Sequence, residues 1–311
     1  MVEQELEKIL RKQGYGIIGN HAAVKLCHWM RQKLFYGRVC YKEAFYGIKT
    51  HQCLQMTPSV DACTQMCVFC WRNQQYTKVE IEKPDMPETI FERAVVEQRR
   101  LLTGFKGDKR CNLQLWREAQ EPRHVAISLA GEPALYPYLS ELIEIFKKNN
   151  FTTFLVTNGT LPDVIRGLNS LPTQIYVTVA APNEEVYRKT CLPLRKENWK
   201  KLQETLRILP SIDCRKVIRH TLVKGWNLGW AEEYAKLDML AEPDFIEAKA
   251  YVFVGGSRTR LSIDCMPFHE EIMKFAEELS RETGYKIIGE KRDSRVALLS
   301  SEKKPQRIQN L

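Results

Sequence analysis

The sequence has no run of apolar residues that approaches the length of about 18 needed to span a bilayer. Its first residues, MVEQELE, are acidic and lack the basic-then-apolar order of a secretory signal. We therefore expect a cytoplasmic protein without membrane contact. The sequence also lacks low-complexity tracts and any internal repeat beyond a strand–helix alternation.

Cysteine, in contrast, is abundant, with 10 residues in a chain of 311. Disulfide frameworks are rare in the reducing cytoplasm, so several of these thiols are expected to bind metal. Hydrophobic residues make up 44% of the chain, which is enough to fill a sizeable core. This length is long for one compact domain but ordinary for an α/β barrel.

The net charge is +9, from 47 Lys and Arg against 38 Asp and Glu. An RNA partner would explain this excess, although runs of charge are equally often solvated faces. The basic residues form two groups along the sequence. The first is Arg188, Lys189, Arg195, Lys196, Lys200, Lys201, Arg207, Arg215, Lys216 and Arg219, and the second is Lys286, Lys291, Arg292, Arg295, Lys303, Lys304 and Arg307.

Three cysteines lie close together in the stretch CTQMCVFC, at Cys63, Cys67 and Cys70. Iron–sulfur clusters are normally held by four thiolates, so three local ones leave one iron open. An open iron on a reducible cluster can bind and reduce a substrate. A zinc site completed by a distant residue would accept the same spacing and stays open as an alternative.

Apolar runs alternate with helical patterns through most of the chain. This alternation predicts a parallel sheet with right-handed crossovers, and six βα units suit a partial barrel rather than the closed eightfold one. Strands are expected at 53–56, 124–129, 152–156, 175–179, 216–223 and 245–254, and helices at 88–102, 138–148, 163–168, 198–209, 231–240 and 270–283.

The barrel is expected at 53–284, between an N-terminal segment at 1–52 and a C-terminal extension at 285–311. The N-terminal segment should contain helices at 1–13 and 21–35, the second with Cys27 inside it, followed by a loop through Tyr41, Lys42 and Glu43. Residues 103–122, which include Cys111, have the composition of an insertion. The extension shows β-like runs at 285–288 and 296–299.

In such a barrel the functional groups gather at the carboxyl ends of the strands. The cysteine stretch follows the first strand, and Gly131-Glu132 follows the second, where a glycine lets a ligand approach the backbone. Thr157-Asn158 follows the third, with short polar side chains that could bond a ribose. Each is by itself only a strand-to-helix turn, but their succession after the cysteine stretch favours one shared site.

The spacing C-x-x-x-C-x-Φ-C, with Phe69 in the aromatic slot, resembles the signature of the radical S-adenosylmethionine (radical SAM) superfamily. The resemblance implies a partial (β/α)6 barrel and a 4Fe–4S cluster that binds S-adenosylmethionine at its open iron. It places Phe69 beside the adenine. Gly131 and Glu132 are similar to the family's "GGE" motif, which binds the amino group, with Ala130 in place of the first glycine.

Three further cysteines precede the barrel, at Cys27, Cys40 and Cys53, separated by twelve residues each time. They could converge if the N-terminal segment folds over the barrel mouth. Alternatively, each could be a small buried hydrophobic residue.

Together the six cysteines and the Tyr41-Lys42-Glu43 segment resemble the tRNA 4-demethylwyosine synthases, in the archaeal form. The resemblance covers the whole chain and extends to FCWRN at 69–73, VKGWN at 223–227 and VGGSR at 254–258. It implies that 1-methylguanosine, next to the anticodon of tRNA-Phe, is condensed with pyruvate. The chain leaves no room for the flavodoxin-like domain of eukaryotic relatives, so an external flavodoxin- or ferredoxin-like electron donor and a monomer are expected.

The same resemblance implies two 4Fe–4S clusters, with the second on Cys27, Cys40 and Cys53. This second cluster would hold pyruvate through its open iron. A competing possibility is a Schiff base from Lys42, which is reasonable chemistry for a ketoacid.

Two other functions stay open from the residues alone. One is a radical enzyme that acts on a protein or small molecule, and the other is a non-catalytic, zinc-dependent RNA-binding module. If RNA binds, the flipped base would need stacking partners. The tryptophans considered for this are Trp199, Trp226 and Trp230.

Overall fold

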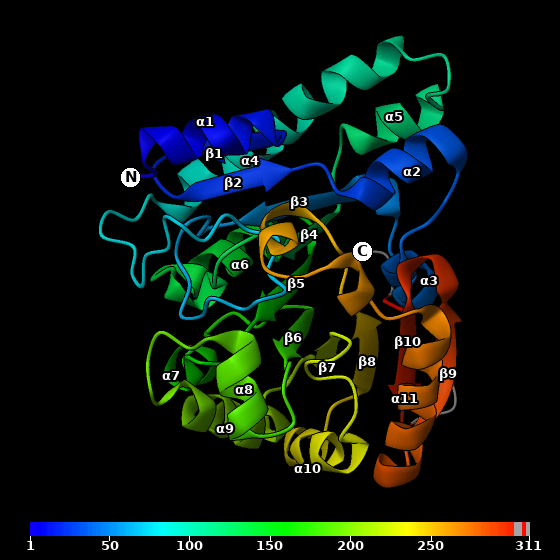
Figure 1. Ribbon diagram of the computed structural model, residues 1–311. Helices are drawn as coiled ribbons and strands as arrows, with labels where there is room; N and C mark the ends of the chain where they lie inside the picture. The colour runs from blue at the N-terminus through cyan, green and yellow to red at the C-terminus, as the bar shows by residue number, and fades with distance from the viewer. Residues whose placement is uncertain (302–306, 309–311) are drawn as a thin grey trace.

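Six parallel strands form the centre of a ten-stranded sheet (Figure 1). The computed structural model describes residues 1–301 and 307–308. The parallel strands are β3 (Cys53–Thr57), β4 (His124–Ile127), β5 (Thr152–Thr157), β6 (Gln174–Thr178), β7 (Arg215–Leu222) and β8 (Phe245–Ala250). The sheet order is β1-β2-β3-β4-β5-β6-β7-β8-β10-β9, so the predicted partial barrel is confirmed.

Helices between the strands bury one face of the sheet in the main hydrophobic core. They are α4 (Pro87–Leu102), α6 (Leu139–Lys148), α7 (Pro162–Arg166), α8 (Glu184–Cys191), α9 (Asn198–Ile208), α10 (Ala231–Ala241) and α11 (His269–Thr283). Only α8 was not predicted. Its signal is the N-cap Asn183, whose side chain accepts a hydrogen bond from Val186 N at 3.0 Å, followed by two glutamates in the first turn.

The N-terminal segment contributes a strand hairpin that was not predicted. After α1 (Gln4–Lys12), strands β1 (Tyr15–Ile18) and β2 (Ala22–Lys25) pair antiparallel, and β2 pairs with β3. The helix expected from residue 21 therefore begins only at His28, in α2 (His28–Tyr36), because sheet pairing overrides the helix propensity of the alanines. Cys27 moves from the helix interior to its N-cap.

The expected loop at Tyr41-Lys42-Glu43 is instead a short helix, α3 (Tyr41–Tyr46). Its aromatic side chains pack against the face of the sheet that the outer helices leave free. This second core contains Tyr41, Phe45, Tyr46, Ile48, Phe154, Tyr176, Val217, Phe245, Val296 and Leu298. A helix that fills the barrel interior explains why the prediction of a loop was wrong: its residues are fixed by tertiary packing rather than by a local pattern.

The C-terminal extension adds two strands to the sheet, β9 (Lys286–Lys291) and β10 (Val296–Ser300), and the predicted β-like runs are confirmed. β10 pairs antiparallel with β8 and β9. The insertion at 103–122 contains α5 (Leu113–Ala119) and the buried Cys111. Lys303 and Lys304 lie outside the described residues, and within the described part no helix is long and apolar enough to cross a membrane.

Candidate active site

The cysteine stretch lies in the loop after β3 and is held in place by backbone hydrogen bonds. Cys63 N donates to Lys78 O at 2.8 Å, and Val68 N donates to Thr190 O at 2.9 Å. Cys63, Cys67 and Cys70 are half-buried free thiols. The loop is therefore shaped by the protein itself, with its three sulfurs in one short segment.

Gly131 contacts this loop through backbone rather than through a side chain. It has a φ of +68°, and a Cβ at this position would collide with the carbonyl oxygens of Ser59 and Ala62. Glu132 N donates to Ala62 O at 2.8 Å. The glycine was predicted to admit a ligand, but in the structure the close approach that requires it is to the cysteine loop.

Glu132 is 1% exposed and ties the ends of two strands together. Its Oε1 accepts from Thr157 Oγ1 at 2.6 Å and Ala134 N at 3.0 Å, while Oε2 accepts from Asn158 N at 2.7 Å. Burial raises the pKa of Glu132, and these three donors act against that increase. The Glu132 side chain thus holds the carboxyl ends of β4 and β5 together through these hydrogen bonds.

Asn158 links the β5 end directly to the cysteines. Its Nδ2 lies 3.8 Å from Cys63 Sγ and donates to Thr64 Oγ1 at 2.9 Å. The predicted set of Gly131, Glu132, Thr157 and Asn158 is therefore brought together around the first cysteine of the stretch. Phe69, the last member of that prediction, is half-buried between two hydrophobic clusters.

Two arginines beside the cysteine stretch were not predicted as site residues. Arg72 is 3% exposed and donates to the carbonyls of Asp61 and Gln65, each at 3.4 Å. Arg260 donates to Val68 O at 3.2 Å and also to the carbonyl of Cys70. Their positive charges lie close to the thiols and would stabilise an anionic cluster there. Arg72 could have been predicted, because it lies in the FCWRN segment beside the cysteines. Arg260 is distant in sequence and lies in no motif that points to this site.

The three upstream cysteines also converge, around the N-termini of α2 and α3 and the start of β3. Cys27 and Cys40 are the N-cap residues of the two helices, and Cys53 is the first residue of β3. Burial, together with the charge of the neighbouring thiols, raises the pKa of Cys40 and Cys53 to about 12. Only thiols that lie close together interact in this way.

Lys42 lies inside the barrel beside these cysteines, not at the surface. It is 8% exposed, and its Nζ is 4.7 Å from the ring centre of Tyr176 and 5.0 Å from that of Phe154. Among the described residues, none accepts a hydrogen bond from this amine. Burial, together with the nearby charge of Arg219, lowers the pKa of Lys42. A lowered pKa makes the neutral form of this amine easier to reach than that of an exposed lysine.

A buried network of charged groups from β7 and β8 faces Lys42. Arg219 Nε lies 2.9 Å from Glu247 Oε2, and Arg219 Nη2 donates to Tyr41 Oη at 2.8 Å. Tyr46 Oη donates to Glu247 Oε1 at 2.8 Å. Arg219 was predicted as part of a basic surface, and its place inside the barrel could be read only from the strand register, which aligns it with Glu247.

Lys249, two residues beyond Glu247, completes this network. Its Nζ donates to Ser294 O at 2.9 Å and lies 5.3 Å from the ring centre of Tyr41. Burial, together with Arg219, lowers the pKa of Lys249 to about 8. Lys249 could not be predicted as a site residue, because an isolated lysine in a strand pattern has no functional signature.

Both cysteine sets fit a cubane cluster by their chemistry. Each set provides three thiols, with cations nearby to balance the negative charge of a thiolate-bound cluster, and the buried Cys191 lies beside Cys67 of the first set. Within the described residues, no three His, Cys, Asp or Glu side chains are close enough to hold a single metal ion. A cluster does not need such a grouping, since each thiolate binds a different iron.

Three members of the first basic group, Arg188, Lys189 and Lys201, form ion pairs on their own helices. Arg188 and Lys189 lie 2.6 Å from Glu184 and Glu185, respectively. Of the tryptophans considered for stacking, Trp199 is buried, Trp226 is half-buried and Trp230 is 47% exposed. The RNA-binding role of these residues stays a prediction.

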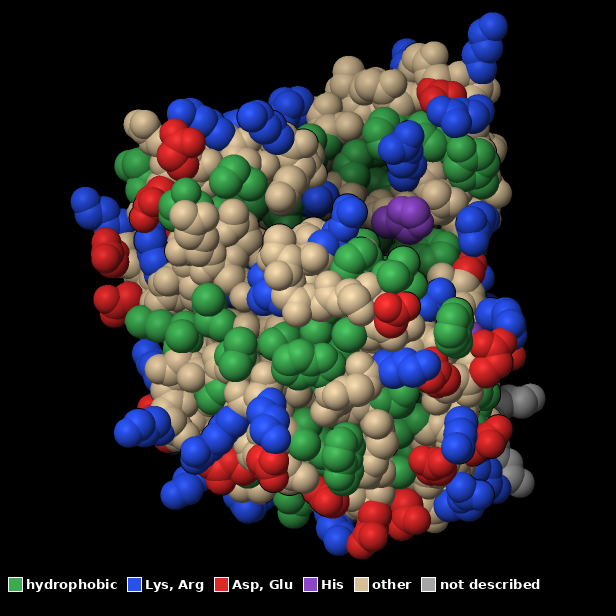
Figure 2. All heavy atoms as spheres, in the orientation of Figure 1, with side chains coloured by type: hydrophobic (Ala, Val, Ile, Leu, Met, Phe, Trp, Pro, Cys, Tyr) green, Lys and Arg blue, Asp and Glu red, His purple; other side chains and the backbone are tan. Residues whose placement is uncertain are grey.

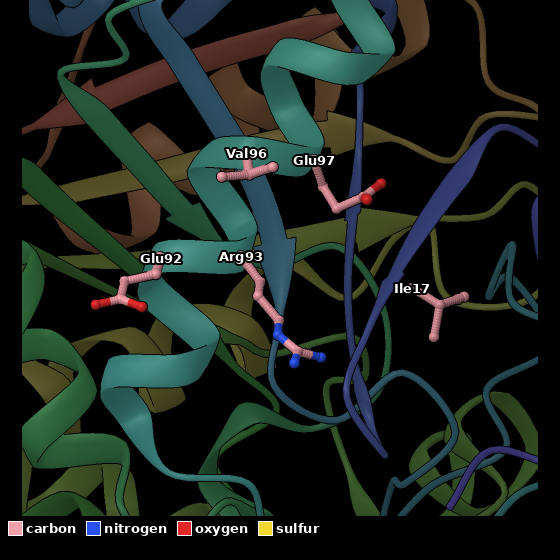
Figure 3. A pocket seen from close by; sticks show the side chains of 5 residues that line it. All are labelled: Ile17, Glu92, Arg93, Val96 and Glu97. Atoms are coloured by element: carbon pink, nitrogen blue, oxygen red, sulfur yellow. The ribbon is translucent and has the colours of Figure 1, made fainter.

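Figure 2 shows one face of the molecule, on which hydrophobic side chains gather across the middle with Lys and Arg around them, and which is hollowed beneath α2. A separate open pocket of about 400 Å³ lies between α4 and β1 (Figure 3). Its lining is Ile17, Glu92, Arg93, Val96 and Glu97, none of which belongs to the predicted site.

Comparisons with known proteins find two matching family models. The model described as "Radical SAM superfamily" matches residues 57–237, and the one described as "Wyosine base formation" matches residues 240–301.

Relatives and solved structures are similar over nearly the full chain. The S-adenosyl-L-methionine-dependent tRNA 4-demethylwyosine synthase of Pyrococcus abyssi is 47% identical over 302 residues, covering 95% of this chain and 88% of the relative. The enzyme of the same name from Methanocaldococcus jannaschii is 45% identical over 312 residues, covering 97% of each. A solved structure described as TYW1 with a lysine-pyruvate adduct bound superposes with a TM-score of 0.89 at 44% identity, covering 98% of both chains.

The contact at Gly131 leads to a first testable prediction. Gly131→Ala should destabilise the protein by about 2 kcal/mol or more, because it combines a left-handed backbone with a collision against the cysteine loop. The matched control is Gly104→Ala, since Gly104 has no atom within 4 Å of the added Cβ and no positive φ. Urea unfolding under anaerobic, reducing conditions measures both variants, and equal midpoints would contradict the contact.

Proposed function

The chain belongs to the radical SAM superfamily and, within it, to the family of tRNA 4-demethylwyosine synthases, and on this basis we propose that it condenses 1-methylguanosine in tRNA-Phe with pyruvate to give 4-demethylwyosine. The observation that supports this best is the pair of three-cysteine sets at one barrel, with Lys42 buried beside the second set. A radical enzyme for a protein substrate would not require this ketoacid-reactive amine.

Two 4Fe–4S clusters are proposed, one on Cys63, Cys67 and Cys70 and one on Cys27, Cys40 and Cys53. When bound, the first cluster supplies the electron that cleaves S-adenosylmethionine and so yields the 5′-deoxyadenosyl radical that abstracts hydrogen from the unactivated guanine N-methyl group. The protein's own contribution is to hold the thiols in a fixed loop and to place positive charge around them.

Around the first set, the residues of the β4 and β5 ends are proposed to bind S-adenosylmethionine. Glu132 keeps the two strand ends in register, and Asn158 orients Thr64 and Cys63. Phe69 is proposed to lie beside the adenine. Gly131 lets the cysteine loop approach the β4 end, so it fixes where the cosubstrate can sit relative to the sulfurs.

Lys42 is proposed to anchor pyruvate as a Schiff base. Its neutral amine would attack the C2 carbonyl carbon, and the carbonyl oxygen would leave as water, giving a C=N bond. The burial of Lys42 and its pKa support this over binding at the second cluster's open iron alone, and the solved relative holds a lysine-pyruvate adduct. The aromatic rings of Phe154 and Tyr176 lie 5.0 and 4.7 Å from the amine and help to bury it.

The binding of the tRNA base and the identity of the electron donor are also proposals. The target base would leave the stacked anticodon loop to reach the barrel, as in enzymes that flip bases. A flavodoxin- or ferredoxin-like protein is proposed as the electron donor. The reaction is proposed to take place in the cytoplasm. The excess of Lys and Arg over Asp and Glu would support RNA binding.

The first set of cysteines is tested by Cys67→Ala. Two remaining thiolates hold a cluster poorly, so this variant should form no 5′-deoxyadenosine from S-adenosylmethionine after reduction, as measured by chromatography. Cys214→Ala is the control, because Cys214 lies just before β7 and its charged neighbours are Lys216, Asp244 and Asp213 rather than cysteines of either set. Cleavage at a near-normal rate in Cys67→Ala would refute the assignment.

The second set is tested by changing Cys27, Cys40 and Cys53 together to Ala. About half of the iron should be lost, since each set is expected to hold one 4Fe–4S unit. Cleavage of S-adenosylmethionine should persist, but no tricyclic base should appear on tRNA. Unchanged iron would mean that these cysteines only pack, and full product formation would mean that the cluster is dispensable.

Lys42 is tested by trapping with borohydride, which reduces an imine to a stable amine. Wild-type protein treated with pyruvate and borohydride should carry the three-carbon adduct on the peptide that contains Lys42, and Lys42→Arg should carry none. Lys33→Arg is the control, because Lys33 lies in α2 and pairs with Glu43. An adduct of equal yield in Lys42→Arg would show that another lysine reacts.

A further inference from the structure

We propose that Lys249 binds the carboxylate of the ketoacid held by Lys42 and thereby selects a 2-ketoacid over an uncharged carbonyl compound. This inference rests on the proposed function, because it requires the Schiff base at Lys42. It assigns a specificity-determining role to a residue that neither the sequence patterns nor the cysteine sets mark.

The strand register places Lys249 on the inner face of the barrel. Side chains two residues apart on a strand point to the same side, so Lys249 shares the side of Glu247. Glu247 contacts Arg219 and Tyr46 in the interior, which fixes that side as the inner one. On the neighbouring strands Lys249 lies opposite Thr221 of β7 and Val296 of β10.

Lys42 and Lys249 share the same charged neighbours. Arg219, Glu247 and Cys40 act on the charge of both lysines, and both lysines act on Cys27. Their contacts also connect them: Lys42 Nζ and the Arg219 guanidinium lie 4.7 and 4.4 Å from the ring centre of Tyr176, and Tyr41, which accepts from Arg219, has Lys249 Nζ 5.3 Å from its ring centre. A molecule attached to the Lys42 amine therefore lies near the Lys249 ammonium. In pyruvate the carboxyl carbon is bonded directly to the C2 carbon that condenses with the amine, so its carboxylate must stay close to Lys42.

The carboxylate that lies near the two lysines is already paired. Glu247 is 0% exposed, and its two oxygens accept from Arg219 and Tyr46, respectively. Arg219 has this carboxylate as its ionic partner, donates to Tyr41 as well, and has its guanidinium 4.4 Å from the ring centre of Tyr176. The charges of these two groups thus balance each other.

Lys249, in contrast, has a charge without a carboxylate. In the described part of the chain, no carboxylate oxygen lies within 4.0 Å of its Nζ, which donates one hydrogen bond, to Ser294 O. An ammonium has three donors, so two are left for a ligand. The sulfurs of Cys27 and Cys40 are poor competitors, since sulfur is a weak acceptor and both are proposed to bind iron. A ligand carboxylate matches this unpaired, half-buried cation best.

The covalent step itself is unchanged by this assignment. The Lys42 amine adds to C2, the carbonyl oxygen leaves as water, and the product is an imine whose carboxylate is intact. No oxidant or reductant is needed. Lys249 contributes a hydrogen-bonded ion pair to the carboxylate and is thus a positioning residue for the ketoacid, while Lys42 forms the bond.

The test compares the capture of pyruvate and of its uncharged methyl ester by borohydride trapping in the iron-loaded protein. The wild type should reach half-maximal labelling of Lys42 at a concentration of pyruvate well below that of the ester. Lys249→Gln should require about tenfold more pyruvate or higher, since a hydrogen bond to a charged group is lost, but should label with the ester as the wild type does. Lys249→Arg should recover part of the preference. Lys286→Gln is the control, an exposed lysine of β9.

Each outcome decides the proposal. An equal loss of labelling with pyruvate and ester in Lys249→Gln, or a loss of iron, would show a structural role and overturn it. Unchanged labelling with pyruvate would overturn it as well. If the wild type labels with neither compound, the Schiff base at Lys42 fails and this inference fails with it. If pyruvate labels the wild type and Lys249→Gln equally, only the role of Lys249 is refuted, and the Schiff base at Lys42 stands.

Discussion

The structure depends on the insertion of α3 into the interior of a partial barrel. A parallel sheet of six strands must bury both faces, and helices between the strands cover only the outer one. The aromatic residues of α3 cover the inner face, where they pack against Phe154, Tyr176 and Phe245. The same helix has Cys40 at its N-terminus and Lys42 in its first turn, so the packing that completes the core also positions the chemistry.

This arrangement favours the proposed role of Lys42 as the amine that captures the ketoacid. Burial of its ammonium lowers the pKa of Lys42, so the neutral form that the proposed Schiff base requires is easier to reach. The carboxylate of Glu247 could stabilise the Lys42 ammonium, but it is paired with Arg219 instead. Because Glu247 pairs with Arg219, it does not pair with Lys42. Lys249 likewise has no carboxylate partner among the described residues and is proposed to bind the carboxylate of the ketoacid.

The sequence predicted the sheet well and the inner site poorly. The apolar runs located all six parallel strands, and the strand-end motifs with Cys63, Cys67 and Cys70 located the first site, because those features are local in sequence. The hairpin at β1 and β2, the helix α3 and the inward position of Arg219 were missed, since each is fixed by contacts between distant segments. Cys27, Cys40 and Cys53 were grouped by family resemblance, and the structure brings them together.

In the proposed reaction this chain builds a tricyclic base from 1-methylguanosine and two carbons of pyruvate. The most direct measurement incubates the reduced, iron-loaded protein with S-adenosylmethionine, with tRNA-Phe that carries 1-methylguanosine, and with pyruvate labelled with carbon-13 at C2 and C3. Mass spectrometry of the nucleosides should show 4-demethylwyosine containing both labelled carbons. Formation of 5′-deoxyadenosine without any labelled nucleoside, or a product with no carbon from pyruvate, would contradict the account.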